Sequence, residues 1–204
     1  MRLLTKKAIE ISLESDDQDS LFVDPLLDRE QIGPVSLDLR LGYDFQVSIL
    51  TRRPSIDPSD QSSRRRSIAS YFQETRRDLG DRFVLYPDQV VVTTTLEYVS
   101  LPTNVYADIL TRSSYTRLGI QLNTMVQPGW RGCMPLELCN HGSTPIEIVV
   151  GARLVQVRLF EIDEANAYSD PSNPRKYHGN VRPTVSRARH DDDLARLVHA
   201  REQD

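Results

Sequence analysis

The stretch TRSSYTRLG, residues 111–119, gathers side chains that are suited to holding an anion. Arg112 and Arg117 each carry a planar fork of N–H donors, and Ser113 and Ser114 add hydroxyl groups between them. Charge-assisted hydrogen bonds of this kind are roughly twice as strong as neutral ones. We therefore expect the stretch to bind a di- or triphosphate, with a polar turn between two strands as the alternative. It is not a Walker loop, because the glycine-rich approach and the GK[ST] ending are missing.

A second candidate group lies in QPGWRGCMPLELCN, residues 127–140. If this stretch is a strand, alternation divides it into one face with Cys133, Pro135, Glu137 and Cys139 and another with Met134, Leu136, Leu138 and Asn140. Glu137 then has apolar neighbours whichever way the strand turns. Desolvation raises the pKa of a glutamate, which suits a group that must both take and give a proton. The alternative is an edge-strand glutamate that faces water.

Metal and nucleophile chemistry receive little support from the residue pattern. The zinc deaminase signature, H-x-E followed by P-C-x-x-C, is absent, and no G-x-S-x-G elbow occurs. No partner at ligand spacing accompanies any of the four histidines, His141, His178, His190 and His199. Six positions of extended strand separate Cys133 from Cys139 by roughly 20 Å, so we expect both to be reduced core residues.

Composition indicates an ordinary globular chain of 204 residues, 39% hydrophobic and 26% charged. The formal net charge of −4 argues against a general nucleic-acid binder. Neither a run of roughly 18 apolar residues nor a signal peptide is present, so we expect a cytoplasmic protein without a membrane partner.

The hydrophobic pattern predicts strands after one short amphipathic helix at residues 5–15. The expected strands are 35–42, 83–86, 89–95, 97–101, 105–110, 119–126, 132–140, 146–150 and 153–162. Many short strands favour an all-β barrel or sandwich in one domain, residues 1–190, followed by a charged tail, 191–204. Residues 51–82 form an Arg/Ser-rich excursion with a short helix expected near 67–75.

These motifs, in this order, resemble the dCTP deaminase branch of the trimeric dUTPase superfamily. The likeness runs through GPVSLDLRLG, LPTNVYADILTRSSYTRLGI, PGWRGCMPLELCNHGSTP and RKYHGNVRPTVSR. It implies a distorted β-barrel or jelly-roll, and a homotrimer with its sites between subunits. It also implies hydrolytic deamination of dCTP to dUTP and ammonia, with Mg²⁺ carried by the triphosphate, no protein-bound zinc, and dTTP as a candidate regulator.

The resemblance also implies roles for individual residues. Glu137 would be the catalytic base and acid, and Ser113 would orient the water or the exocyclic amine. The phosphate-binding residues would be Arg112, Ser114, Arg117, Lys176 and Tyr168. The base and sugar pocket would be lined by Asn123, Thr124, Gln127, Trp130, Met134, Pro135, Tyr177 and Asn180.

Two departures from the family pattern keep alternatives open. Gln127 stands where the superfamily usually has aspartate, and the segment between Gly119 and Trp130 is about three residues shorter than usual. The loss of the aspartate lowers our expectation of diphosphate cleavage. The alternatives are a dUTPase or bifunctional deaminase-pyrophosphatase, and a nucleotide-binding sensor without catalysis.

Overall fold

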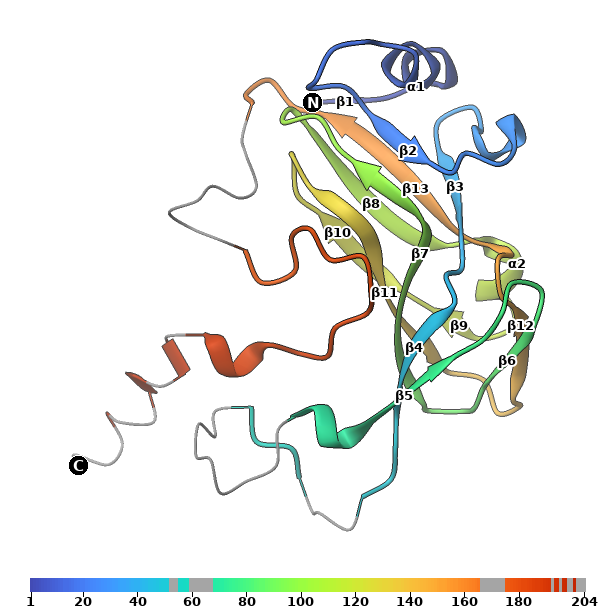
Figure 1. Cartoon of the computed structure of the whole chain (residues 1–204), viewed down its shortest axis with the longest axis vertical. Coiled ribbons are helices and arrows are strands. Elements are labelled where there is room, and N and C mark those ends of the chain that lie inside the picture. Colours follow the sequence, from blue (N-terminus) through green and yellow to red (C-terminus); the bar gives the residue numbers. More distant parts are fainter. Residues whose placement is uncertain are drawn as a thin grey trace.

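A computed structural model describes residues 1–51, 55–58, 68–165, 175–191, 193–194, 196–197 and 200. These residues form mainly antiparallel β-sheets, and two short α-helices, α1 (Lys6–Leu13) and α2 (Ser113–Thr116), lie among the strands (Figure 1). Single turns of 3₁₀-helix occur at η1 (Arg29–Gln31), η2 (Ile68–Tyr71) and η3 (Ala188–His190).

One sheet carries the first and last strands of the fold side by side. Its order is β1 (Arg2–Leu3), β13 (Arg153–Glu161), β8 (Val105–Thr111) and β10 (Asn123–Val126), and β3 (Leu37–Arg40) also pairs with β13. The β8 strand leads directly into α2, so this sheet positions the arginine-serine stretch.

The other large sheet carries Glu137. Its order is β5 (Phe72–Arg76), β4 (Asp44–Ser48), β7 (Val90–Ser100), β11 (Arg131–Asn140) and β9 (Ile120–Gln121), and β2 (Phe22–Asp24) also pairs with β7. A separate pair is formed by β6 (Arg82–Leu85) and β12 (Ile146–Val149).

Apolar side chains from both large sheets meet in one buried cluster. Alternating apolar residues supply it: Leu37 and Leu39 of β3 are buried, and so are Met134, Leu136 and Leu138 of β11. Fully burying a side chain of this size contributes about 1.5–3 kcal/mol. The core therefore fixes which face of β11 points inward, and it leaves the face of Glu137 outward.

Most of the expected elements are confirmed. The N-terminal helix begins after Thr5, whose backbone is extended as at an N-cap but whose side chain makes no capping hydrogen bond. The expected strands from 83 onward are present, although 89–101 forms the single strand β7 and 119–126 is split into β9 and β10.

Three expectations need correction. The helix expected near 67–75 is only the η2 turn, and the residues after it form β5, which pairs with β4. The strand expected at 35–42 is shorter, and Val35 is 41% exposed. Cys133 and Cys139 are free thiols, but both are half-buried on the outward face of β11 rather than in the core.

No α-helix in the described part of the chain is long and apolar enough to cross a membrane. The division into one domain, 1–190, and a tail stays a prediction.

Candidate active site

Glu137 lies on the outward face of β11, between two pockets that share it as a wall. Its strand neighbours Leu136 and Leu138 are fully buried on the opposite face, so the backbone that carries the carboxyl group is rigidly held. Facing it across the ladder is Val92 of β7. The strand alternation expected for this stretch is confirmed by the burial pattern.

The first pocket, which we call the covered pocket, has a volume of about 340 Å³. Its floor comes from β7 and β11 and its cover from the segment 175–187. The residues around it are Phe72, Val90, Val92, Thr94, Trp130, Cys133, Pro135, Glu137, Tyr177, Asn180, Arg182, Pro183, Thr184 and Ser186. Concave, mostly apolar pockets with a few polar groups are the usual form of small-molecule sites.

The second pocket, which we call the open hollow, lies on the other side of Glu137, toward α2 and β9. It has a volume of about 510 Å³ and is lined by Leu110, Thr111, Thr116, Gln121, Leu122, Glu137, Cys139 and His141. Through Thr116 it reaches the end of α2, so Glu137 and the arginine-serine stretch border the same hollow.

The segment 175–191 is docked on β11 by backbone hydrogen bonds. The Cys133 amide donates to the Asn180 carbonyl at 2.9 Å, and the Gly179 amide donates to the Arg131 carbonyl at 2.8 Å. In Figure 1 this orange-red segment runs beside β11. The segment is fastened to itself as well, since the Arg187 amide donates to the Tyr177 hydroxyl at 2.9 Å and Lys176 forms an ion pair with Asp191. Tyr177 and Asn180 are thereby brought over the covered pocket.

Gly132 permits this docking, and its replacement by alanine is expected to release the segment. The residue has a φ of +139°, and a Cβ there would lie 2.5 Å from the Asn180 carbonyl oxygen. Strain of this kind costs on the order of 1–3 kcal/mol. In Gly132→Ala we expect amide hydrogen exchange at Cys133 and Gly179 to accelerate by about tenfold or more.

Gly80→Ala is the matched control, because Gly80 also has a positive φ, +91°, but no atom lies within 4 Å of a Cβ built there. Gly80→Ala should introduce comparable backbone strain without accelerating amide hydrogen exchange at Cys133. Unchanged exchange in Gly132→Ala would show that the segment is held independently of this close approach.

Desolvation dominates the electrostatics of the covered pocket. The Glu137 side chain is exposed in the single chain, but the surrounding protein partly desolvates its carboxyl group. This desolvation raises the pKa of the carboxyl group. Burial, helped by the negative charge of Glu97, raises the pKa of the Cys133 thiol to about 11. Because Cys133 is then protonated at neutral pH, Glu137 is the stronger candidate for a base in this pocket.

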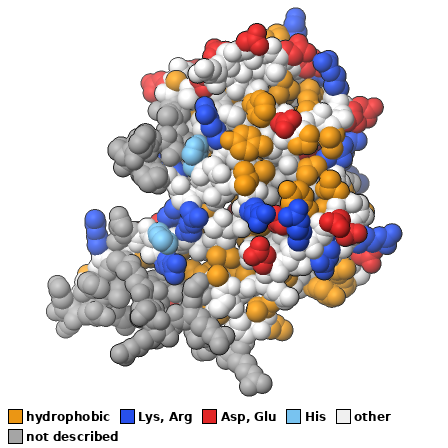
Figure 2. Space-filling view, in the orientation of Figure 1, with side chains coloured by type: hydrophobic (Ala, Val, Ile, Leu, Met, Phe, Trp, Pro, Cys, Tyr) orange, Lys and Arg blue, Asp and Glu red, His pale blue; other side chains and the backbone are white. Residues whose placement is uncertain are grey.

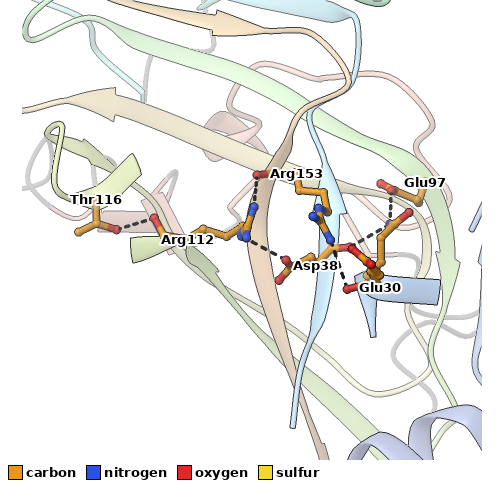
Figure 3. Close-up of polar contacts among 7 residues, drawn as sticks. Glu30, Asp38, Glu97, Arg112, Thr116 and Arg153 are labelled. Carbon is orange, nitrogen blue, oxygen red and sulfur yellow. Dashed lines mark hydrogen bonds and ion pairs between the residues drawn. The ribbon is translucent and has the colours of Figure 1, made fainter. Parts of the chain in front are cut away.

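The arginine-serine stretch forms α2, a single helical turn at the end of β8. The side chains of Ser113, Ser114 and Arg117 are exposed, and Arg117 makes no ion pair with any residue in the described ranges. Arg112 differs, because its Nε lies 3.1 Å from Asp38 Oδ2 and its Nη1 donates to the Arg153 carbonyl at 3.2 Å (Figure 3). Within one chain, none of these exposed donors lines the covered pocket.

The remaining predicted residues are placed unevenly. Trp130, Pro135, Tyr177 and Asn180 line the covered pocket. Met134 does not, because alternation turns it into the core, where it is fully buried. We therefore withdraw Met134 from the predicted pocket lining.

Other predicted residues lie away from both pockets. Thr124 is half-buried on β10, Gln127 is exposed just beyond it, and neither lines the covered pocket or the open hollow. The backbone of Asn123 begins β10. Lys176 belongs to the docked segment, whereas Tyr168 falls outside the described residues.

Sequence reasoning missed the residues that β7 contributes to the pocket. Val90, Val92 and Thr94 reach it because β7 pairs with β11, placing Val92 opposite Glu137. The outward period-2 positions of residues 90–94 were a usable signal, but only once the pairing partner was known.

No group of three or more His, Cys, Asp or Glu side chains in the described parts of the chain is arranged to hold a metal ion. The expectation that zinc is not bound by the protein stays a prediction.

The fold and the site together define a β-sheet protein with a carboxyl group of raised pKa beside a pocket of the size that a small molecule requires. Residues 3–162 match the family model described as dCTP deaminase-like. The chain belongs to the dCTP deaminase-like family, which confirms the predicted resemblance.

Individual relatives agree with this assignment. The chain is 34% identical over 200 residues to a protein of Methanobrevibacter smithii named dCTP deaminase, dUMP-forming, covering 95% of this chain and 99% of that protein. It is 33% identical over 180 residues to a protein of Haloarcula marismortui named dCTP deaminase, covering 86% and 90% respectively.

A solved structure is similar as well. The 2'-deoxycytidine 5'-triphosphate deaminase from Agrobacterium tumefaciens superposes with a TM-score of 0.56 at 28% identity. The match covers 76% of this chain and 47% of that one, so this chain spans about half the length of that protein.

Proposed function

We propose that this protein hydrolytically deaminates dCTP to dUTP and ammonia. The observation that carries the proposal is Glu137, a carboxyl group with a raised pKa on the wall of an apolar pocket, in a chain of the dCTP deaminase-like family. The names of the relatives from Methanobrevibacter smithii and Haloarcula marismortui support the same substrate.

In this reaction Glu137 removes a proton from a water molecule, and the resulting hydroxide attacks C4 of the cytosine ring. The protonated carboxyl group then donates its proton to the C4 amino group, and the C–N bond breaks as ammonia leaves. Ser113 would orient the water or the amine. Proton transfer of this kind contributes about 10² to 10⁴-fold to the rate. Positioning of the base in the pocket supplies a further part of the acceleration.

The triphosphate is assigned to Ser114 and Arg117, whose side chains are exposed at α2. Mg²⁺ would arrive with the nucleotide as part of the substrate. Because the exposed donors do not line the covered pocket of their own chain, a site between subunits of a homotrimer explains both groups of residues.

A second candidate is the same deamination followed by hydrolysis of dUTP to dUMP and pyrophosphate. The name of the Methanobrevibacter smithii relative, dUMP-forming, favours it. The relative from Haloarcula marismortui, of nearly equal identity, carries no such term. Gln127, at the position where the superfamily usually has aspartate, stands against the cleavage.

Product analysis tests the proposal and separates the two candidates. Purified protein is incubated with dCTP and Mg²⁺, and nucleotides, ammonia and pyrophosphate are quantified together. Equal amounts of dUTP and ammonia are expected. The appearance of dUMP and pyrophosphate would establish the bifunctional reaction. Tight binding of dCTP or dTTP without any product would instead establish the non-catalytic sensor and overturn the proposal.

The pH dependence should report the environment of Glu137. A general base works only when ionised, and the pKa of Glu137 lies above the ordinary glutamate value of 4.5. As the pH falls through this raised pKa, the carboxylate is protonated and kcat/KM for dCTP is expected to fall in proportion. A profile measured at constant ionic strength checks this, and an acid inflection at or below 4.5 would contradict it.

The cytoplasmic location, the lack of nucleic-acid and membrane partners and regulation by dTTP stay predictions. Figure 2 shows Lys and Arg side chains interspersed with Asp and Glu on the face in view, rather than gathered in one basic surface.

A further inference from the structure

Arg112 links α2 to the interior of its own chain. Its side chain reaches Asp38 on β3 and the carbonyl of Arg153 on β13, at 3.1 and 3.2 Å. Its backbone carbonyl meanwhile accepts hydrogen bonds from the amides of Tyr115, at 2.9 Å, and Thr116, at 3.1 Å. The residue that starts the helical turn is thus the residue whose guanidinium group is anchored (Figure 3).

Asp38 is a firm anchor because the residues behind it are buried and bonded. Its carbonyl accepts a hydrogen bond from Nε2 of Gln31 at 2.9 Å, and Gln31 is fully buried. The same Nε2 donates to Oε1 of Glu97 at 2.9 Å, while Oε2 of Glu97 accepts from the Arg40 amide at 2.9 Å. These hydrogen bonds fix the β3 backbone at Asp38, and the carboxylate extends from this fixed backbone to Arg112.

The α2 turn has little means of holding itself in place. It is four residues long, and helical turns of this length are not stable on their own. The Asp38–Arg112 pair is also shielded, with the two side chains 12% and 34% exposed, so the attraction is less screened than at an open surface. The pair therefore adds a side-chain anchor to two other contacts of this turn, the hydrogen bond from the Arg112 amide to the Leu154 carbonyl at 3.0 Å and the packing of Tyr115 against the core.

We propose that Asp38 is a positioning residue of the nucleotide site, which acts through Arg112 to hold α2 so that Ser114 and Arg117 face the phosphates. In this arrangement the charge of Arg112 is engaged by Asp38, and Arg112 serves as the link rather than as a main phosphate ligand. The proposal rests on the proposed function for its effect on the substrate, but its effect on α2 is independent of catalysis.

The experiment compares Asp38→Asn with Asp108→Asn. Asparagine keeps the shape of the side chain and removes its charge. Asp108 is the matched control because it forms an ion pair of similar length, 3.2 Å, with Arg158 and lies on the same strand that leads to α2. Two quantities are measured: amide hydrogen exchange at Tyr115 and Thr116, and kcat and KM for dCTP with Mg²⁺.

For Asp38→Asn we expect exchange at Thr116 to accelerate about tenfold and KM to rise about tenfold, with kcat changed by less than about threefold. Asp108→Asn should change neither quantity. In an Arg112→Ala background, adding Asp38→Asn should raise KM no further, because the link is already broken. A cooperative thermal unfolding transition at the wild-type temperature confirms that each variant keeps the fold.

Unchanged exchange at Thr116 in Asp38→Asn overturns the proposal, and so does a full additional rise in KM in the Arg112→Ala background. If the wild-type protein does not turn over dCTP, the proposed function fails. Hydrogen exchange, together with titration of the wild type and Asp38→Asn with dCTP, then decides the role of Asp38. Faster exchange with weaker dCTP binding supports it, and unchanged exchange or unchanged binding overturns it.

Discussion

Replacing Glu137 with glutamine is expected to lower kcat for dCTP deamination by about 10² to 10⁴-fold while changing the affinity for dCTP by less than about threefold. Glutamine fills the same volume on the outward face of β11, so the covered pocket keeps its shape. It cannot accept the proton of the attacking water or return it to the leaving amine. The loss should therefore appear in the chemical step, as ammonia release at saturating dCTP, and not in binding measured by calorimetry.

Glu147→Gln provides the control, because Glu147 is an exposed glutamate on β12 that pairs with Arg82 at 2.8 Å and borders neither pocket. It should retain the wild-type kcat. If Glu137→Gln also kept a near-normal kcat, the base would have to be another group.

Replacing Arg117 with alanine is expected to raise KM for dCTP by about 10- to 100-fold with little change in kcat. Arg117 is exposed at the end of α2, where a guanidinium group can reach substrate phosphates. Charge-assisted hydrogen bonds contribute about 1.5–3 kcal/mol each, and every 1.4 kcal/mol is a tenfold change in affinity. The KM of Arg117→Lys should lie between those of the wild type and Arg117→Ala, since lysine keeps the charge but lacks the planar guanidinium group.

Steady-state kinetics with dCTP and with deoxycytidine identifies the group that Arg117 contacts. The loss should be large with dCTP and absent with deoxycytidine, which carries no phosphate. An equal loss with both substrates would mean that Arg117 supports the structure of the site instead. Arg2→Ala serves as the control, because Arg2 is an exposed arginine on β1 that pairs with Glu161 at 2.7 Å, away from α2.

Much of the fold was predictable because its strands carry strong local patterns. In β11 alternation put Glu137 on the opposite face from Met134, Leu136 and Leu138, and the packed core then decided which of the two faces is buried. Period-2 alternation is a local property of a half-buried strand, so it can be detected without knowing the pairing partner.

Other elements were missed because their conformation depends on distant partners. The β4 and β5 strands stabilise each other by pairing. This pairing is not visible in the local sequence, so residues 67–75 were expected to be helical. The three-residue strand β2 was also missed. It forms by pairing with β7, and this partner, rather than the short β2 sequence, sets its register.

By itself the sequence determined the chemical groups that the chain brings to the site. These are the guanidinium and hydroxyl groups of residues 112–117 and the carboxyl group of Glu137 among apolar neighbours. The order of the motifs also identified the family. Tertiary structure alone decided how these groups are used. It docked segment 175–191 over the covered pocket through Gly132, and it turned Met134 inward. It also tied Arg112 to Asp38, a residue of a separate strand. Residue types and strand alternation are local properties of the sequence. Contacts between distant segments, in contrast, form only when the strands pair into sheets and the core packs.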